Sequence, residues 1–414
     1  MRPSFEFAPA LLVTISMLAS ARAQTAGADP WPVWQRTASR LGRTTTIGPR
    51  TPTVAWKLRI DDTNWESGLE SSAALDAQGR LFVGVHEQVT CVDTVNREVL
   101  WGFYTYDPVL STPAVSEGRV LFGTTSGDNA TFYCVTADTG DELWSFFIPG
   151  GRVNSSPVVD DLVVYFSSGD VIYARSVEDG SEVWTRDMSG VIIYTSPSLD
   201  GLGRLFNGGA ASYFAFDVAD GGTTWEFPLD AFPRGTGAVE SGRLYLSTRG
   251  GPFSRLVYCI NAQTSSEIWR FEDSPRDLTG TVALGHPDVG RVYALASIDW
   301  LFCLDGRDGS EVWRLNRASG LCKSGAIVDG SETIYFGVAT TGKRVCAVRP
   351  DGTELWTYPM PERVFPSPLL APDGTLYVIC SDKYLYAFHD PPNLDKTDGG
   401  EQAEPTQVHP VPPP

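Results

Sequence analysis

The stretch SSPVVDDLVVYFSSGDVIYARSVEDGSEVW, residues 155–184, contains one complete copy of the unit from which this chain is built. It comprises four short runs of β-branched and aromatic residues separated by Gly, Asp or Ser. Such runs are typical of antiparallel strands joined by tight turns. We expect the first three runs to form the inner strands of a small sheet, and the run that ends in Trp184 to form its outer edge.

A tryptophan closes each copy of this unit, and these tryptophans recur at intervals of 40 to 45 residues. A repeat of about 40–45 residues is the signature of a β-propeller with four-stranded blades. The sequence therefore predicts an all-β, eight-bladed β-propeller of four-stranded antiparallel blades, in which each tryptophan docks between neighbouring blades. The eight structural tryptophans are Trp56, Trp101, Trp144, Trp184, Trp225, Trp269, Trp313 and Trp356.

The two ends of the repeat indicate how the ring closes. The last copy, after Trp356, has three strand-like runs and no tryptophan run, whereas the first tryptophan run, 54–58, has no blade before it. Pairing this N-terminal strand with the C-terminal blade completes an eighth blade and leaves no open sheet edge. We therefore assign residues 51–390 to the propeller and residues 24–50 to a lead-in segment.

Two further recurring positions have a structural interpretation. A glycine four residues before the tryptophan supplies the positive φ that a hairpin turn often needs. An acid two residues before the tryptophan is interpreted as a solvated outer-strand position rather than as part of a catalytic ring. The glycines are Gly140, Gly180, Gly221, Gly309 and Gly352, and the acids are Glu142, Glu182, Glu267, Glu311 and Glu354.

Five of the seven cysteines also follow the repeat, since each lies ten residues before a blade tryptophan. Other blades have alanine at this place, so cysteine acts there as a small buried hydrophobe. Equivalent positions in neighbouring blades lie too far apart for a disulfide, which predicts free thiols. These five are Cys91, Cys134, Cys259, Cys303 and Cys346. Cys322 and Cys380 stand outside the pattern, and the sequence does not pair them.

The repeat resembles the pyrroloquinoline-quinone-type propeller repeat family. The family signature is a Leu-Tyr-Ala-Leu-Asp strand, a Thr-Gly or Asp-Gly turn and a strand ending in Trp, and LFCLDGRDGSEVW at residues 301–313 matches it closely. Trp31-Pro32-Val33-Trp34, followed by Leu41-Gly42-Arg43, resembles the lead-in of non-enzymatic members. The resemblance spans about residues 31–390, and it is more specific for the fold than for the activity.

The resemblance implies two alternative functions. Enzymatic members are secreted dehydrogenases that bind the quinone with calcium on the propeller axis and commonly carry two adjacent cysteines, whereas non-catalytic members include the propeller lipoprotein of the outer-membrane barrel-assembly machinery. This chain has no Cys-Cys pair, and four strands of ~5–6 residues per blade leave only about five residues for each connection. We expect a binding or assembly scaffold for a protein or peptide partner, with no catalytic residue, cofactor or metal. A quinone- and calcium-dependent periplasmic oxidoreductase is the alternative.

Charge and the terminal sequences bear on partners and compartment. The net charge of −18 at pH 7 repels phosphate backbones and anionic membrane surfaces, which argues against nucleic-acid binding. Residues 1–23 are interpreted as a secretory signal peptide, so we expect an exported, periplasmic or extracellular monomer that is not inserted in a membrane. The Pro-rich and acidic residues 391–414 are expected to be disordered.

Candidate binding residues lie in the loops that lead into the inner strands. Trp65 lies in an unusually long acidic connection, where an exposed ring would be a contact anchor. Arg234 and Lys323 place cations where most blades have Ser, Thr or Gly, and Asn154 occupies a similar place. Side chains that point to the axis would form a polar funnel for an anion or a peptide carboxylate. Packing of Trp65 on its own blade, and an ordinary water-filled channel lining, are the competing interpretations.

Overall fold

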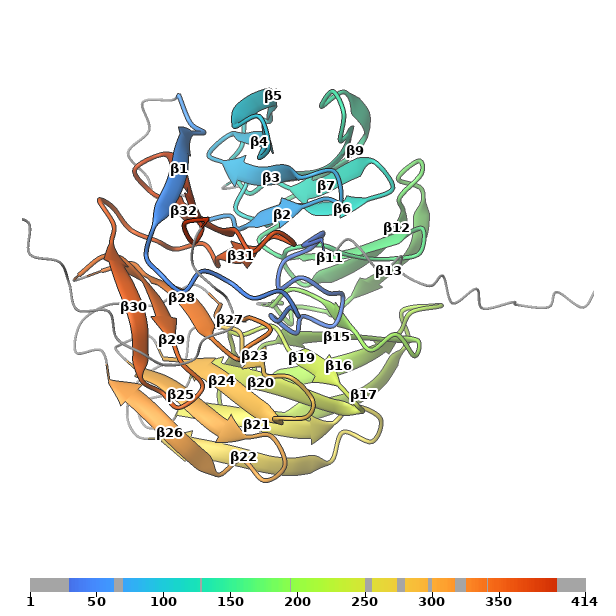
Figure 1. Cartoon of the computed structure of the whole chain (residues 1–414). Helices are drawn as coiled ribbons and strands as arrows, with labels where there is room; N and C mark the ends of the chain where they lie inside the picture. Colours follow the sequence, from blue (N-terminus) through green and yellow to red (C-terminus); the bar gives the residue numbers. More distant parts are fainter. Residues whose placement is uncertain are drawn as a thin grey trace, which may run out of the picture.

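The computed structural model describes residues 30–62, 70–126, 129–193, 195–249, 255–273, 280–296, 300–316, 325–340 and 342–392. Within these ranges the secondary structure consists of strands without a helix, and eight small antiparallel sheets are arranged in a ring (Figure 1). The predicted eight-bladed β-propeller is confirmed. No helix that is long and apolar enough to cross a membrane occurs in the described part of the chain.

In the first four blades the strands follow one another in chain order from the axis outward. They are β2 (Ala73–Leu75), β3 (Arg80–Val85), β4 (Gln88–Asp93) and β5 (Glu98–Tyr104) in blade 1; β6 (Ala114–Ser116), β7 (Arg119–Gly123), β8 (Asn129–Thr136) and β9 (Glu142–Pro149) in blade 2; β10 (Val158–Asp160), β11 (Val163–Ser168), β12 (Val171–Ser176) and β13 (Glu182–Asp187) in blade 3; and β14 (Ser198–Leu199), β15 (Arg204–Gly209), β16 (Ser212–Asp217) and β17 (Thr223–Pro228) in blade 4.

The other four blades have the same arrangement, except that the outer strand of blade 8 is the N-terminal β1. Blade 5 carries an additional short strand, β18 (Phe232–Pro233), beside β20. They are β19 (Ala238–Glu240), β20 (Arg243–Arg249), β21 (Arg255–Asn261) and β22 (Glu267–Asp273) in blade 5; β23 (Ala283–Leu284), β24 (Arg291–Leu295), β25 (Trp300–Asp305) and β26 (Glu311–Asn316) in blade 6; β27 (Ile327–Val328), β28 (Ile334–Val338), β29 (Arg344–Val348) and β30 (Glu354–Pro359) in blade 7; and β31 (Leu369–Leu370), β32 (Leu376–Cys380), β33 (Tyr384–Phe388) and β1 (Val54–Arg59) in blade 8.

The core lies between the blades, where sheets pack face to face. The second and third strands are buried on both faces, as in β3, whereas outer strands such as β5 alternate between partly buried and exposed residues. This difference explains why the inner strands consist of continuous apolar runs. The five acids that recur before the tryptophans are exposed, in agreement with their interpretation as solvated outer-strand residues.

Six of the eight blade tryptophans join neighbouring blades through a hydrogen bond of the indole, as predicted for their docking. Trp101 in β5 donates its indole N–H to the carbonyl of Ala137 in blade 2 at 3.1 Å. A Cβ on Gly140 would lie 2.7 Å from the ring of Trp101, and the φ of Gly140 is +74°. Glycine is therefore required there both by the turn conformation and by the approach of the ring. The same indole-to-carbonyl bond joins Trp144 to Val177, Trp184 to Val218, Trp225 to Ala262, Trp269 to Gly306 and Trp313 to Pro350.

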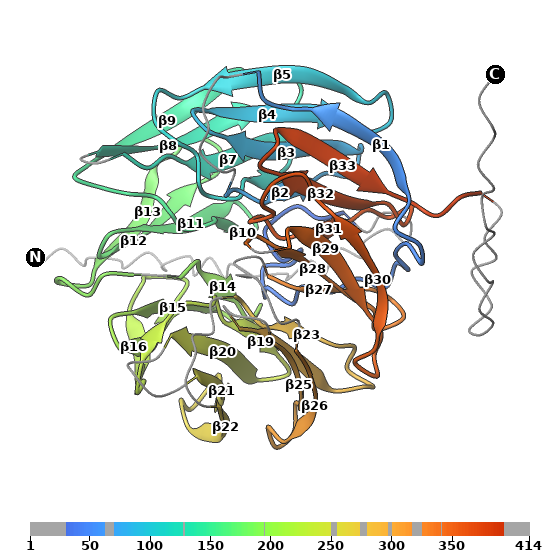
Figure 2. The same ribbon diagram turned by 90° about the vertical axis from the view of Figure 1, so that its left-hand side faces the viewer.

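The ring closes between the two ends of the chain, as predicted. Strand β1 pairs antiparallel with β33, and Trp56 lies opposite Ala387 (Figure 2). Blade 8 has no hairpin turn between these strands, because they come from opposite ends of the sequence. Trp356 instead donates its indole N–H to the carbonyl of Pro49 in the lead-in, at 2.9 Å.

The described cysteines are free and buried, which confirms the prediction for the five repeat cysteines. Burial raises the pKa of the Cys303 thiol to about 12, so this thiol is unreactive at neutral pH. The assumed equivalence of Cys346 is wrong by one residue: Ala347 pairs with Trp356, because the turn in blade 7 is one residue shorter than that in blade 6. Cys380 is also free, and Cys322 lies outside the described residues.

Candidate functional site

The lead-in closes one end of the central channel. Its backbone forms hydrogen bonds with the innermost strands of six blades, near the ends of those strands, and its blue trace crosses the middle of the ring in Figure 1. The bonds join Trp31 to Leu75, Pro32 to Val115, Ala38 to Leu199, Ser39 to Val239, Leu41 to Leu284 and Gly42 to Val328. The segment therefore belongs to no blade and holds several blades together.

Arg40 anchors the lead-in to blades 3 and 4. Its side chain is fully buried, and its Nη2 donates to the carbonyls of Ser156 and Pro157 at 2.9 and 3.0 Å. Its Nε donates to Pro197 and its Nη1 to Trp34. No ion pair of Arg40 with a carboxylate occurs among the described residues, and burial lowers the pKa of the guanidinium to about 9. Carbonyl oxygens alone therefore satisfy this charge.

A ring of hydroxyl groups surrounds the axis just before the innermost strands. The backbone N–H of one blade donates to the hydroxyl of the next, at 2.8–3.2 Å. These bonds tie together the starts of the innermost strands. They join Ser72 to Thr112, Thr112 to Ser156, Ser156 to Ser196, Ser196 to Thr236, Thr236 to Thr281, Gly325 to Ser367 and Ser367 to Ser72.

Blade 7 has Gly325 where the other blades of this ring have a hydroxyl residue. The side chain of Gln35 occupies that space, because a Cβ on Gly325 would lie 2.0 Å from its Nε2 and a Cβ on Gly42 would lie 2.2 Å from its Oε1. Both amide atoms of Gln35 are buried, and neither forms a hydrogen bond with any residue that the structure describes. The lead-in thus fills the channel up to the level of the hydroxyl ring.

The other end of the channel carries a groove of about 620 Å³ beside blades 3 and 4. Its floor contains the buried Ser155, Ser167 and Thr195, while Asn154 and Ile192 are exposed at its mouth. Three glycines at the rim have positive φ, and no atom lies within 4 Å of where their Cβ atoms would be at Gly150, Gly169 and Gly190. The rim therefore carries no side chain at these three positions, and the groove combines polar and apolar surface.

The structure places two of the four candidate binding residues. Asn154 lines the groove, as expected for a residue at the channel mouth. Arg234 is exposed before the innermost strand of blade 5 and is not among the residues that line the groove. Trp65 and Lys323 lie outside the described residues. The sequence analysis did not identify Arg40, because this residue has no counterpart in the repeat. It interpreted the repeated Ser and Thr residues only as channel lining.

The described hydroxyl groups on the floor of the groove are engaged in hydrogen bonds. Ser155 donates its hydroxyl to the carbonyl of Ser167, and Thr195 donates to Oδ1 of Asn207 at 2.6 Å. No histidine lies among the described residues that line the groove. Arg152 and Asp170 supply one charge of each sign at its edge.

Two titratable side chains, His86 and Asp61, lie close together at the same end of the channel as the groove, between blades 8 and 1. Nε2 of His86 lies 3.2 Å from Oδ2 of the buried Asp61, and Nζ of Lys383 lies 3.9 Å from the same oxygen. Burial lowers the pKa of His86, and this effect outweighs the opposing influence of Asp61. His86 belongs to the turn between β3 and β4 and lies outside the groove.

The described residues do not fit a quinone–calcium centre. Calcium requires about six to eight oxygen ligands, usually including several carboxylates. In the described part of the chain no group of three or more His, Cys, Asp or Glu residues could hold a metal ion. We therefore derive no reaction step through such a centre.

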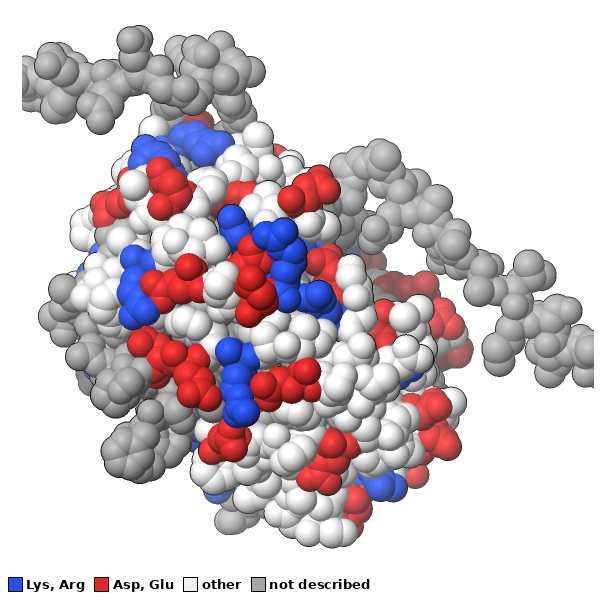
Figure 3. Space-filling model, turned by 90° about the horizontal axis from the view of Figure 1, so that it is seen from below, with Lys and Arg blue, Asp and Glu red and all other residues white. Residues whose placement is uncertain are grey.

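The outer surface carries mixed charges. On the face in Figure 3, Lys and Arg side chains are interspersed with Asp and Glu. On the outer strands of blades 5 and 6, Arg270 pairs with Asp230 and Glu267, and Arg314 pairs with Glu311. Neighbouring opposite charges of this kind do not form the basic stripe that a nucleic acid would bind.

Comparisons with solved structures reflect the fold. BamB from Moraxella catarrhalis is 15% identical, covers 81% of this chain and 98% of its own, and has a TM-score of 0.64. A europium-containing methanol dehydrogenase is 13% identical over 84% of this chain and 89% of its own, with a TM-score of 0.69. Quinohemoprotein alcohol dehydrogenase from Comamonas testosteroni is 14% identical over 91% of this chain and 83% of its own, with a TM-score of 0.72.

A family model also matches the chain. No curated protein matches the chain. The family model described as outer membrane protein assembly factor BamB matches residues 40–190, 122–248, 168–316 and 299–402. Because these matches together span most of the sequence, the chain belongs to the pyrroloquinoline-quinone-type propeller repeat family that this BamB model describes.

Proposed function

We propose that this chain is an exported, non-catalytic scaffold that binds an extended segment of a partner protein at the open end of its channel. The observation that carries the proposal is the groove of about 620 Å³ beside blades 3 and 4, on the end opposite the lead-in. Its volume falls within the range of about 300–1,000 Å³ that is usual for binding sites.

The groove offers the contacts that an extended peptide uses. Its glycine rim at Gly150, Gly169 and Gly190 leaves open space for a bound chain, and the amide of Asn154 can both donate and accept hydrogen bonds. Ile192, which is 49% exposed, adds apolar contact. Backbone hydrogen bonds combined with shallow apolar contacts are the means by which extended peptides are recognised.

The family supports a protein partner and an exported location. Its model is described as an outer membrane protein assembly factor, and BamB from Moraxella catarrhalis shares the fold. An assembly factor of the outer membrane works outside the cytoplasm and acts on proteins. The expected signal peptide at residues 1–23 agrees with export of this chain.

Site-specific photo-crosslinking tests the proposal. A photoreactive phenylalanine analogue placed at Ile192 in the full chain, expressed in its native host, should give a discrete adduct with one protein. The matched control is Val312 on the outer strand β26, which is 42% exposed, and it should give no such adduct. Asn154→Arg, which fills the groove mouth, should weaken the adduct at position 192. Equal adducts at both positions, or none, would contradict the proposal.

The alternative function is a quinone- and calcium-dependent oxidoreductase, and two structural neighbours, named as alcohol and methanol dehydrogenases, support it. Calorimetric titration of the chain with pyrroloquinoline quinone in calcium buffer separates the two functions. Stoichiometric binding tighter than about 1 μM, followed by dye-linked oxidation of alcohols, would replace the scaffold proposal. Absence of binding would remove the alternative.

A further inference from the structure

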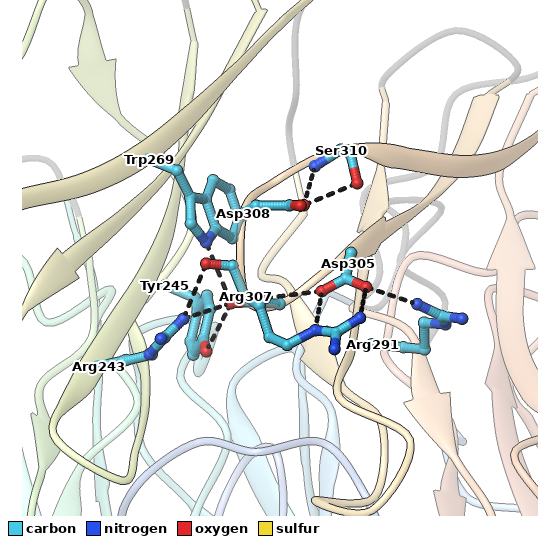
Figure 4. A network of polar contacts seen from close by, with 9 residues as sticks. Arg243, Tyr245, Trp269, Arg291, Asp305, Arg307, Asp308 and Ser310 are labelled. Atoms are coloured by element: carbon cyan, nitrogen blue, oxygen red, sulfur yellow. Dashed lines mark hydrogen bonds and ion pairs between the residues drawn. The ribbon is translucent and has the colours of Figure 1, made fainter.

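A second hollow, of about 160 Å³, lies at the sealed end between blades 5 and 6. Arg243, Arg291 and Arg307 line it, together with Glu240 and glycines of the neighbouring turns. In Figure 4, Arg243 and Arg291 approach from opposite sides and the guanidinium of Arg307 lies between them. This arrangement gathers three cationic groups in one small space.

Hydrogen bonds fix the turn that carries Arg307. Its Nε and Nη2 donate to Asp305 at 3.1 and 2.8 Å, and Arg291 donates to the same carboxylate at 3.2 Å. These two arginines hold the pKa of Asp305 well below its usual range. The carbonyl of Gly306 accepts hydrogen bonds from Arg243 at 2.7 Å and from Trp269 at 3.1 Å. The arginines are therefore pre-positioned (Figure 4).

The corresponding seam between blades 1 and 2 has the opposite charge at the decisive position. There Arg80, the first residue of β3, pairs with Asp138 in the turn of blade 2. Arg243 is likewise the first residue of β20, and Arg307 corresponds to Asp138, because each lies two residues before the turn glycine. A cation thus replaces the carboxylate that would neutralise Arg243.

The nearby carboxylates are already engaged. Glu240 pairs with Arg43 of the lead-in, and Glu332, beside Gly285, accepts a hydrogen bond from Tyr293. Asp308 accepts from Ser310 and points away from the hollow (Figure 4). Among the described residues no carboxylate forms an ion pair with Arg243. Asp305 already neutralises part of the charge of Arg291 and Arg307, so Arg243 is the cation beside them for which the described residues supply no carboxylate, and an anion bound there would stabilise it.

We propose that this hollow binds a tetrahedral oxyanion, a phosphate or sulfate group. Guanidinium groups match the geometry of such anions and form strong charge-assisted hydrogen bonds with them. A volume of 160 Å³ equals roughly five water molecules at ~30 Å³ each, which suits an anion of five heavy atoms. The site is independent of the groove at the opposite end and of the function proposed for it.

Calorimetric titration of the full chain with inorganic phosphate and with sulfate, at constant ionic strength, tests the proposal. We expect saturable binding of one ion per chain. Arg243→Ala should weaken it at least 10-fold, and Arg307→Asp, which recreates the pairing of Arg80 with Asp138, should abolish it. Arg349→Ala removes the same charge from an exposed turn in blade 7 and should leave binding unchanged. Melting temperatures of the variants check that they fold.

Two outcomes would overturn the proposal: no saturable binding of either ion up to about 10 mM, or equal weakening by Arg349→Ala and Arg243→Ala. Sedimentation with phosphatidylglycerol vesicles identifies the source of the anion. Binding of inorganic ions without vesicle binding indicates a free ion. Vesicle binding that Arg307→Asp abolishes indicates a phosphate headgroup, and vesicle binding that survives Arg307→Asp lies elsewhere and counts against this site.

Discussion

The two ends of the channel are built from the same eight repeats and differ in what is added to them. At one end the lead-in forms backbone hydrogen bonds with six innermost strands, and Arg40 adds four bonds to carbonyl oxygens. At the other end, connecting loops border a groove with an exposed glycine rim. The difference leads us to expect that the contacts of the lead-in stabilise the sealed end, and it is consistent with the binding role proposed for the open end.

The lead-in also supplies groups that the repeat lacks. The amide of Gln35 occupies the space left by Gly325 in the hydroxyl ring, and Pro49 provides the carbonyl that accepts from Trp356 at the closing seam. In both places one residue from outside the repeat substitutes for a missing element of a blade. The sealed end should therefore respond strongly to single substitutions, and the open end weakly.

The largest effect is expected for Arg40→Ala. It leaves three buried carbonyl oxygens and one partly buried carbonyl oxygen without this donor, and it removes the anchor of the lead-in. We expect the free energy of unfolding to fall by about 3–5 kcal/mol, measured by chemical denaturation. Arg349→Ala, on an exposed turn, should change it by less than about 0.5 kcal/mol. A loss below about 1 kcal/mol for Arg40→Ala would remove the contrast between the two ends.

A double-mutant cycle at Gln35 and Gly325 tests whether the Gln35 amide takes the place of the hydroxyl that blade 7 lacks. Gly325→Ser alone forces a Cβ to within 2.0 Å of the Gln35 amide and should cost about 2–3 kcal/mol. In the double variant with Gln35→Ala, the serine hydroxyl can complete the ring, so we expect a favourable coupling of at least about 1 kcal/mol. Additive effects in urea denaturation would show that the two side chains do not compete for one space.

The parts of the fold that could be predicted are those that the sequence repeats. The docking of Trp101 and the turn at Gly140 are confirmed because each has counterparts in other blades, so one physical explanation had to fit them all. Spacing alone is less secure. Cys346 follows the ten-residue rule and is still out of register, because one residue is missing from its turn.

The parts that could not be predicted occur once. Arg40 lies outside every repeat, and nothing in its sequence neighbourhood indicates that its partners are carbonyls of blades 3 and 4. The groove likewise depends on how two loops and a turn meet, and only Asn154 among its residues was a candidate. Trp65 and Lys323 remain predictions, since they lie outside the described residues.

A pair of Trp→Phe variants compares the closing seam with a regular one. Trp356→Phe removes the N–H donor to the buried Pro49 carbonyl and leaves only the Tyr335 hydroxyl, whose single proton is shared with Asp329. Trp313→Phe removes the donor to the exposed Pro350 carbonyl, which water can solvate. Loss of a partner costs more at a buried acceptor, so Trp356→Phe should destabilise the protein by about 1 kcal/mol more than Trp313→Phe. Equal losses in thermal denaturation would mean that the lead-in does not strengthen this seam.

The smallest expected effect is the pH dependence of stability that arises from His86 at the open end of the channel. Burial lowers the pKa of His86, so its protonation is easier in the unfolded chain than in the folded one. Its contribution to stability is therefore complete above the ordinary histidine pKa of about 6.5 and is lost as the pH falls below it. Asp61, Lys383 and Glu87 face this histidine, and arginines such as Arg40 at the sealed end stay charged throughout this range.

Between about pH 7.5 and 5.5, where most carboxylates stay ionised, the wild-type chain should lose less than about 1 kcal/mol of stability through His86. His86→Gln should remove this part of the loss, which comparison of urea midpoints at the two pH values measures. Arg40→Ala should lower both midpoints equally and leave the pH difference intact, because it acts at the sealed end. A pH difference that disappears in Arg40→Ala would instead mean that the two ends are coupled through the ring.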